Sequence, residues 1–597
     1  MAETLMRYYE RELAYIRKAL TGFAQRHPEQ AAKLQGKHNN AEDPNITRLL
    51  DGMALLTAKT ELRLDEQFPE IVESLLTILY PGYTQILPSY TNLTLAPDPE
   101  QLQKSLTLPK GNQFVVGSGD QNECVFTTVA DLEIHPFVLS GVDCDVAPFT
   151  FILPEGVEIT DAVIHLTLSC CDPDARFDQL SFNDFEFFVN GFEQNASTLI
   201  ELLLQDTASI TVSNSDFTDF TVIDTDRLQS RISDPEFQWL PRYGNQFEGF
   251  DALRDYFTYS DKGAYFRIKE LGKEIGQYRT NSVVISLFVK QLPIEFLRLF
   301  DTHVFRLYTV PAVNVFEQVG EPMSYDFTKL SVPVVADSSN DTDVEVVSVK
   351  KVQEVKSDGS RFIQPLYGER YLTAGQSSSP LHWQANQHWN ELGKLCMDLS
   401  IGGIQANNLT EEALVLALDL VCCNGTSPCL LVAGTEAECL ARVDLPGSVT
   451  LLTTPSAPVY PVLDETLGWR FISLLNTNFH SLLHTDNPTQ ALKEVLTLCC
   501  PSESCRQADA VRSVSYLPQV AAMQVCGHNI FASGTEVVVT LDASLLNGQI
   551  ALFAQVLNAL YQQFCSFDRF IQVSVHCFGS DDSKMIFPRV HGSQLCP

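Results

Sequence analysis

Residues 79–95 read LYPGYTQILPSYTNLTL, and this stretch separates two different patterns along the chain. Directly upstream, residues 69–80 (PEIVESLLTILY) repeat apolar side chains at helical spacing. Pro81 lacks a backbone N–H and disfavours helix at Tyr80, while Gly82 suits a left-handed helix cap. Downstream, β-branched and aromatic residues alternate with polar ones, which is typical of strands. The stretch therefore predicts a joint between a helical N-terminal module and a long β-rich body.

The helical module, residues 1–85, begins with an amphipathic pattern. Residues 3–26 place apolar side chains near one stripe of an α-helix, with charged residues opposite. Such a stripe must be covered, either by the rest of its own domain or by a partner protein. The stripe consists of Leu5, Tyr8, Tyr9, Leu13, Ile16, Leu20 and Phe23.

Two further helices are predicted before the joint. Residues 46–64 repeat apolar side chains at three- and four-residue steps, and these include Leu49, Met53 and Leu56. A third helix is expected to begin at Pro69, because proline is tolerated in the first helical turn.

Residues 86–330 and 331–460 are interpreted as two β-rich, sandwich-like domains. Short runs rich in Thr, Val and Phe, such as residues 162–170 and 282–289, are separated by Gly, Asp and Asn turns. A short helix is expected over residues 196–205.

Residues 461–597 predict an α+β C-terminal domain. Helices return near residue 466, where Trp469 and Ile472 share an apolar stripe, and Asn487-Pro488 matches an N-cap followed by the first helical position. The last expected elements are a strand at 536–542, an amphipathic helix at 548–565 and a strand at 570–578. The predicted fold class is α+β multi-domain, with a helical N-terminal module, a β-rich body of sandwich-like domains and this α+β domain.

The charge of the chain limits its partners. Its 597 residues carry 74 acidic and 40 basic side chains, a formal net charge of −34. A negative field repels phosphate backbones, so nucleic acid and anionic membranes are poor partners, and a basic protein is a better one. The charged N-terminus lacks the apolar core of a secretory signal, and no run of about 18 apolar residues predicts membrane insertion. The sixteen cysteines are interpreted as reduced thiols of a cytosolic protein.

No catalytic motif emerges from the sequence. Walker, dinucleotide-binding and HExxH patterns are absent. Ser118 lies between two glycines without the spacing of a nucleophile elbow, so it is interpreted as a turn residue. Cys526 and His528 are two positions apart, which rarely brings a nucleophile within reach of its base on a strand. The chain is therefore predicted not to be an enzyme.

Metal and cofactor sites are likewise not predicted. The segments 422–429 and 499–505 are rich in cysteine but lack the paired knuckles of structural zinc sites. Residues 337–345 are acidic like a calcium loop, but the positions that need Gly and Glu hold Thr342 and Ser348.

A series of segments, in order along the chain, matches one known family pattern: YYERELAYIRK, FAQRHPEQAAKL, the run from DPNITRLL to TQILPS, FFVNGFEQNASTLIELLL, LRDYFTYSDKGAYFRIKEL, FRLYTVPAVNVFEQVGEP, DLVCCNGTSP, LGWRFISLLNTNFHSLL, LDASLLNGQIALFAQVLNALYQQFCSFDRFIQVSV and FPRVHG. On these segments the chain resembles the TssF family (also called ImpG or VasA) of type VI secretion baseplate subunits. The resemblance departs from the family pattern at Cys422–Gly425, where the family usually has CTNR, and near residues 474–483, where it usually has HLSLNYLSL.

The resemblance implies a structural, cytoplasmic baseplate component without cofactors. It implies that two copies join one TssG subunit, and that this trimer forms a wedge with TssE and TssK. Six wedges would surround the VgrG spike hub, dock on the inner-membrane-anchored secretion complex and start assembly of the contractile sheath. It also implies that the N-terminal helices join TssG, which would make Leu5, Tyr8, Tyr9, Leu13, Ile16, Leu20 and Phe23 partner-binding residues.

Two alternatives from other classes remain open at this point. A carbohydrate-binding β-sandwich protein would stack sugar rings on Trp383 and Trp389, which are expected to be exposed. A cysteine-dependent hydrolase would use Cys526 and His528.

Overall fold

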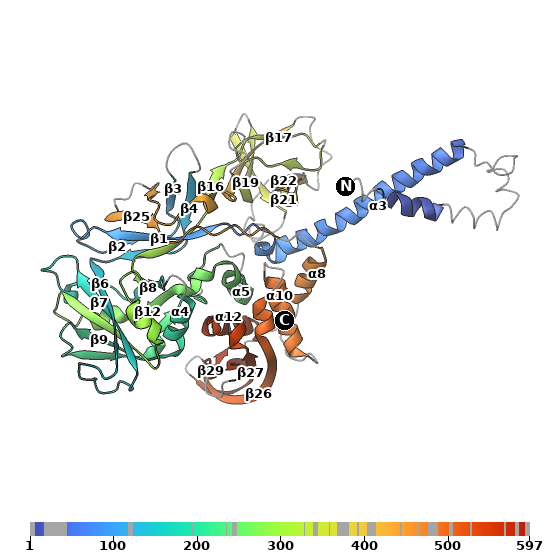
Figure 1. The fold of residues 1–597 in the computed structure, drawn as a ribbon. Coiled ribbons are helices and arrows are strands. Elements are labelled where there is room, and N and C mark those ends of the chain that lie inside the picture. The colour runs from blue at the N-terminus through green and yellow to red at the C-terminus, as the bar shows by residue number, and fades with distance from the viewer. Residues whose placement is uncertain are drawn as a thin grey trace. The chain divides into compact units, whose positions relative to one another are not determined.

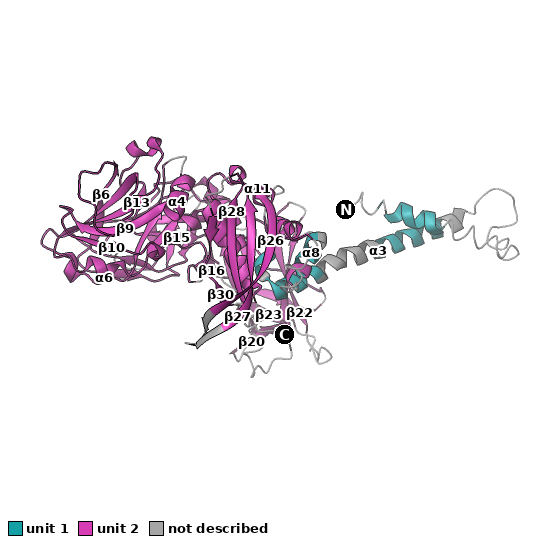
Figure 2. Cartoon of the chain, turned by 90° about the horizontal axis from the view of Figure 1, so that it is seen from below, with its two compact units in different colours: residues 1–84, 462–472 teal, residues 85–461, 473–597 magenta. Residues whose placement is uncertain are grey.

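The computed structural model divides into two compact units, shown in teal and magenta in Figure 2. Unit 1 comprises residues 1–84 and 462–472, and unit 2 comprises residues 85–461 and 473–597. The finer division of the body at residues 330 and 460 stays a prediction. The described residues are 6, 8–16, 44–117, 123–192, 196–234, 236–240, 248–327, 329–337, 344–356, 359–366, 381–390, 393–402, 413–441, 445–461, 465–475, 487–500, 505–525, 528–565, 569–579 and 584–591.

Unit 1 is built on one long helix, α3 (Pro44–Leu79), which is followed by the 3₁₀ turn η1 (Pro81–Tyr83). The prediction of two separate helices here was wrong, because α3 continues through Pro69. A proline inside a helix removes one backbone hydrogen bond but leaves the flanking turns free to continue. The helix ends before Pro81, as the sequence predicted. A shorter helix over residues 8–16 lies beside α3 (Figures 1 and 2).

A six-stranded antiparallel sheet in unit 2 has the order β24-β3-β4-β15-β1-β25. Strand β1 pairs with β15 on one side and β25 on the other, so the sheet joins segments far apart in the sequence. It draws strands from both predicted β-rich parts. The strands are β1 (Tyr90–Pro97), β3 (Gln113–Val116), β4 (Cys124–Thr128), β15 (Thr309–Val313), β24 (Ala437–Cys439) and β25 (Gly447–Leu451).

Two further antiparallel sheets and a strand pair belong to the same part of the chain. Helix α4 (Ala196–Gln205) matches the predicted span and contributes four buried side chains. One sheet, called sheet D below, comprises in spatial order β10 (Phe220–Ile223), β9 (Thr207–Asn214), β13 (Ser282–Val289), β7 (Ala162–Cys170) and β6 (Phe137–Val146). The other comprises β11 (Leu228–Ser230), β12 (Tyr265–Ile268), β8 (Phe185–Val189) and β14 (Phe305–Arg306), and the pair is β2 (Leu106–Leu108) with β5 (Leu132–Ile134).

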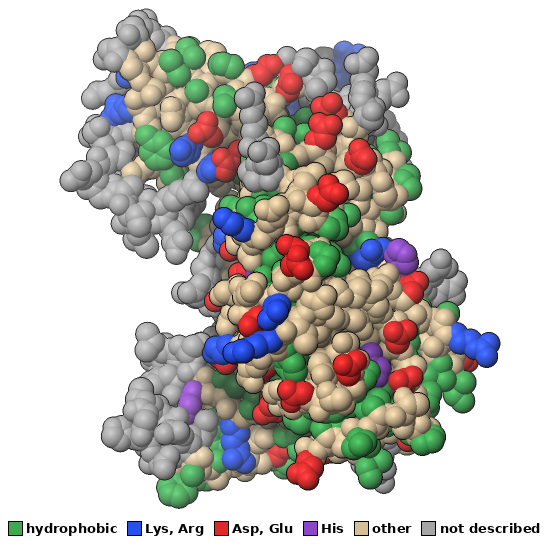
Figure 3. Space-filling view, turned by 90° about the vertical axis from the view of Figure 1, so that its left-hand side faces the viewer, with side chains coloured by type: hydrophobic (Ala, Val, Ile, Leu, Met, Phe, Trp, Pro, Cys, Tyr) green, Lys and Arg blue, Asp and Glu red, His purple; other side chains and the backbone are tan. Residues whose placement is uncertain are grey.

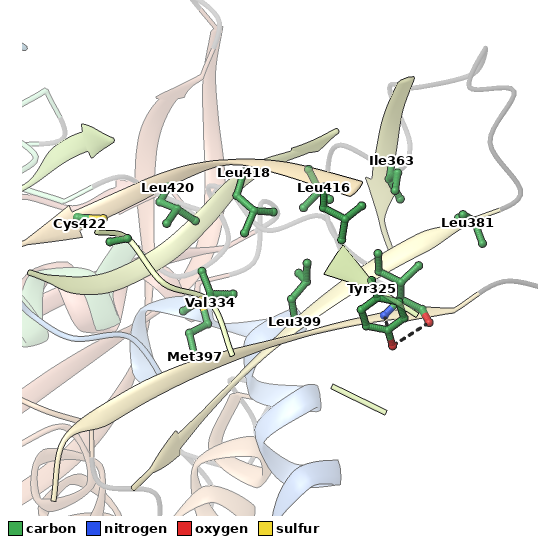
Figure 4. Close-up of a cluster of buried hydrophobic side chains, with 13 residues drawn as sticks. Tyr325, Val334, Ile363, Leu381, Met397, Leu399, Leu416, Leu418, Leu420 and Cys422 are labelled. Carbon is green, nitrogen blue, oxygen red and sulfur yellow. Dashed lines mark hydrogen bonds between the residues drawn. The ribbon is translucent and has the colours of Figure 1, made fainter. Parts of the chain in front are cut away.

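An eight-stranded sheet folds over its own hydrophobic core. Buried and half-buried residues alternate along β22 and β23, as expected for strands with one face inward. In Figure 4, Leu416, Leu418 and Leu420 of β23 point toward Met397 and Leu399 of β22. The strands are β16 (Phe316–Val319), β17 (Met323–Tyr325), β18 (Val332–Pro333), β19 (Glu345–Lys356), β20 (Gly359–Pro365), β21 (His382–Trp389), β22 (Leu395–Gly402) and β23 (Leu414–Cys423).

The C-terminal part is an α+β arrangement, as predicted. Strands β27 and β28 are parallel and are joined by helix α12, while β26 forms a long hairpin with β27. The sequence did not predict β26. The elements are α10 (Pro488–Cys499), α11 (Arg506–Ala510), β26 (Val511–Val525), β27 (His528–Leu541), α12 (Ile550–Gln563), β28 (Phe570–Cys577), β29 (Lys584–Ile586) and β30 (Val590–His591).

Helix α12 packs against β28 of this sheet and also against α4 and α5 (Glu248–Thr258). Side chains cap helix starts across the contact. The Glu201 carboxylate accepts hydrogen bonds from the Ala551 N–H at 2.9 and 3.0 Å, and Gln563 Oε1 accepts one from the Gly249 N–H at 2.7 Å. A Cβ on Gly249 would lie 2.7 Å from the Cα of Leu560, so only glycine fits this close approach. Asn487 caps α10 as predicted, since its side chain accepts a hydrogen bond from the Gln490 N–H.

Candidate partner-binding surface

Helix α3 buries one side in the two parts where its side chains are described, around residues 54–58 and 72–76. Ala54 and Ala58 are fully buried, and Val72 and Leu76 are each 3% exposed. Ala54 and Val72 are five helical turns apart, so these positions share one side of the helix. Small residues at the first two positions suit close approach of a neighbouring helix, and the helix over residues 8–16 lies beside α3 (Figures 1 and 2).

The other side of α3 exposes a second apolar stripe. Leu49, Met53 and Leu56 are 64%, 54% and 69% exposed, and their spacing of four and three residues puts them on one face. At about 100° per residue, this face lies roughly 150° around the helix from the buried side. Ile78, which is 40% exposed, falls on the same line near the end of the helix. We call Leu49, Met53 and Leu56 the α3 stripe.

Helix α8 (Glu465–Leu475) packs against the C-terminal half of α3, and its residues up to Ile472 belong to unit 1. Gly468 permits the contact, because a Cβ there would lie 2.5 Å from Val72 Cγ1. The Phe471 ring stacks on Tyr83 with centroids 4.3 Å apart. The predicted stripe was partly wrong here, since Phe471 is buried whereas Trp469 is 46% exposed. This contact holds one end of α3 while leaving the α3 stripe uncovered.

The predicted partner-binding residues of the first helix are less exposed than the α3 stripe, where the structure describes them. Tyr8, Tyr9, Leu13 and Ile16 are half-buried within unit 1. Leu5, Leu20 and Phe23 lie outside the described residues. Their binding role therefore stays a prediction, and the α3 stripe is the more exposed surface. The sequence predicted the apolar spacing of Leu49, Met53 and Leu56. It did not show which apolar stripe of the helical module would be covered when its helices pack together.

The cavity lined by β8, β12 and β15 has a volume of about 410 Å³. Burial lowers the pKa of His135 in its wall to about 4, so this imidazole is neutral. Arg231 and Arg267 are paired with Glu186 at 3.0 and 2.7 Å. No serine or cysteine is among the described residues that line the cavity. Arg231, Arg267 and Glu186 form an ion-pair cluster in the cavity wall.

The cysteines that drew attention in the sequence differ in exposure: Cys422, Cys423 and Cys505 are buried, Cys499 and Cys500 are half-buried, and Cys429 is exposed. Burial raises the pKa of Cys422 and of Cys423 to about 12, which suppresses thiolate reactivity. In the described part of the chain, no group of three or more His, Cys, Asp or Glu side chains could hold a metal ion. Ser118 and Cys526 lie outside the described residues, and His528 begins β27.

The expectation that both candidate sugar-stacking tryptophans are exposed was wrong for Trp383. This ring packs on the core of the eight-stranded sheet, and its Nε1 donates to the Ile363 carbonyl at 3.1 Å. Trp389 is 42% exposed and lies beside the ring of Tyr460. One exposed ring gives no paired platform for a sugar chain.

An exposed apolar helix face on a large α+β chain is typical of a subunit that assembles with other proteins. On the face in Figure 3, hydrophobic side chains lie among acidic ones. No helix in the described ranges has the length and apolar character needed to span a bilayer.

Comparison with known proteins identifies the family. The model of the type VI secretion system TssF family matches residues 1–594, so the chain belongs to the TssF family. It is 23% identical to the type VI secretion system component TssF1 of Pseudomonas aeruginosa PAO1, over 96% of each chain.

Two solved structures share its fold. A chain of the TssK-TssF-TssG baseplate subcomplex superposes with a TM-score of 0.71 at 20% identity, covering 92% of this chain and 99% of that one. A chain of the type VI secretion baseplate complex gives a TM-score of 0.58 at 20% identity, with 99% and 100% covered.

Proposed function

We propose that this chain is a structural subunit of a type VI secretion baseplate wedge. The observation that carries the proposal is the family match along residues 1–594. A chain of similar fold belongs to a TssK-TssF-TssG baseplate subcomplex, so TssG-like and TssK-like subunits are the proposed direct partners. A second copy of this chain and TssE complete the proposed wedge, and six such wedges are proposed to surround the VgrG hub. The proposed location is the bacterial cytoplasm, at the inner-membrane-anchored secretion complex, and the proposed role is non-enzymatic.

The α3 stripe is the proposed contact with the TssG-like subunit. Full burial of a Leu or Met side chain stabilises by about 1.5–3 kcal/mol. Scaled by their exposures of 64%, 54% and 69%, Leu49, Met53 and Leu56 contribute roughly 3–6 kcal/mol when a partner helix covers them. Tyr8, Tyr9, Leu13 and Ile16 of the first helix are proposed to contribute to the same contact, and the sequence-predicted residues Leu5, Leu20 and Phe23 are proposed to do so too.

The function is tested by deleting the gene for this chain in its own host and imaging a fluorescent sheath subunit. The expected result is loss of assembled sheaths, which a plasmid copy of the wild-type chain restores. A variant carrying Cys422→Ser should restore them equally, because a buried thiol has no chemical role in this proposal. Normal sheath assembly in the deletion strain would reject the wedge role.

A further inference from the structure

The negative charge of this protein is concentrated in one part of the sequence. Residues 111–226 contain 21 acidic side chains and a single basic one, Arg176. These residues include four of the five strands of sheet D. The surface of that sheet and of its loops therefore carries far more negative charge per residue than the chain as a whole.

The loop over residues 147–161, which connects β6 to β7, is held against sheet D. The Phe149 ring meets Phe288 edge-on at 6.2 Å, and the Phe151 ring stacks on Phe217 at 5.1 Å. The Glu158 N–H donates to Ser209 Oγ at 3.3 Å. Two aromatic anchors and a backbone hydrogen bond fix the loop, so its outer residues have defined positions.

This loop combines exposed apolar and exposed acidic residues within ten consecutive positions, 152–161. Ile152 and Ile159 are 87% and 91% exposed, although isoleucine is usually among the most buried residues. The exposed side chains of Glu155, Glu158 and Asp161 lie in the same loop. Among the described residues, no lysine or arginine forms an ion pair with these carboxylates. We call these five residues the loop surface.

We propose that the loop surface binds a basic amphipathic segment of a protein partner, with its apolar side chains on Ile152 and Ile159 and its Lys or Arg side chains on the surrounding carboxylates. The two exposed isoleucines supply apolar area that binding would bury. The unpaired carboxylates supply charge complementarity, which selects and steers a cationic partner. The same charge repels nucleic acids and anionic membranes. This site belongs to unit 2, and the inference is independent of the α3 stripe and of the proposed wedge role.

The test uses the full chain and a fluorescein-labelled helical peptide of about 20 residues, with Leu on one face and Lys on the other. A second peptide carries Gln in place of every Lys. Fluorescence anisotropy compares the wild type with the double variant Ile152→Ser and Ile159→Ser. The matched control is Ile294→Ser with Leu330→Ser, which removes side chains that are 83% and 93% exposed elsewhere. Thermal melting verifies that each variant stays folded.

The expected result is binding of the Lys peptide that weakens at least about tenfold in the loop variant and less than about twofold in the control. The Gln peptide should bind at least about tenfold more weakly than the Lys peptide, and added salt should reduce the difference. Equal binding by the loop variant and the control would show general electrostatic attraction and overturn the proposal. Absence of binding to the wild type at about 100 μM peptide, or equal binding of the two peptides, would also overturn it.

Discussion

The double substitution Met53→Asp with Leu56→Asp on α3 should abolish partner binding without unfolding the chain. These side chains are 54% and 69% exposed, so covering them contributes about 2–4 kcal/mol, at 1.5–3 kcal/mol for a fully buried side chain. Losing that contribution weakens binding roughly 20- to 1,000-fold, and a carboxylate buried without a partner adds a further penalty. In the isolated chain both positions face solvent, so stability should change by less than about 0.5 kcal/mol for each substitution.

The assay is a pull-down with the TssG-like subunit beside a thermal melt of each variant. Leu55→Asp introduces a carboxylate at a position that is 47% exposed and lies about 100–160° around the helix from the three stripe residues, so this variant should retain binding. Ala54→Asp places a charge on the fully buried side and should lower the melting temperature of unit 1. If the double variant binds as well as the wild type, the α3 stripe is not the contact. If its melting temperature falls as far as that of Ala54→Asp, the stripe is part of the intramolecular core.

Three further substitutions test the fold. Burial raises the pKa of Glu201 to about 7 from an ordinary value of 4.5, so its stabilising contribution is complete below pH 4.5 and is lost as the pH rises through 7. Glu201→Gln should therefore stabilise the chain by up to about 3 kcal/mol at pH 8.5, by about 2 kcal/mol at pH 6 and by less than about 0.5 kcal/mol at pH 4.5, and a lower melting temperature at pH 8.5 would contradict this. Leu557→Ala removes a fully buried side chain of α12 and should destabilise by about 2–5 kcal/mol, so an unchanged melt would exclude a core role. Gly468→Leu should push α8 off Val72 at a cost of about 1–3 kcal/mol, with faster hydrogen exchange over residues 465–475; unchanged exchange would disprove the close contact.

The sequence predicted those helices and strands whose own residues contain the deciding feature, such as a cap, a proline or an apolar run. The N-cap at Asn487, the helix end before Pro81 and the strand Ser282–Val289 follow from capping chemistry, proline geometry and a continuous apolar run. The prediction of a helix start at Pro69 was wrong because proline occurs in the first turn of a helix and also, less often, inside one. The local sequence does not distinguish the two cases.

The remaining features depend on contacts between distant residues. Strand β26 contains Pro518 and lacks a clear alternating pattern, and its pairing with β27 decides its structure. The packing of α8 on α3 joins Gly468 to Val72. A glycine inside a helical pattern was the available signal, since such a residue often marks close approach. Which apolar stripe of the helical module stays exposed depends on how its helices pair, and no single-helix pattern contains that information.

The central claim, that this chain is an assembly subunit, is tested most directly by native mass spectrometry. The chain is co-expressed with the TssG-like, TssE-like and TssK-like proteins encoded beside it and purified through a tag on the chain alone. The expected spectrum contains a stable hetero-oligomer in which this chain is bound to the TssG-like subunit. A spectrum showing only the free chain, monodisperse and stable at high concentration, would contradict the account.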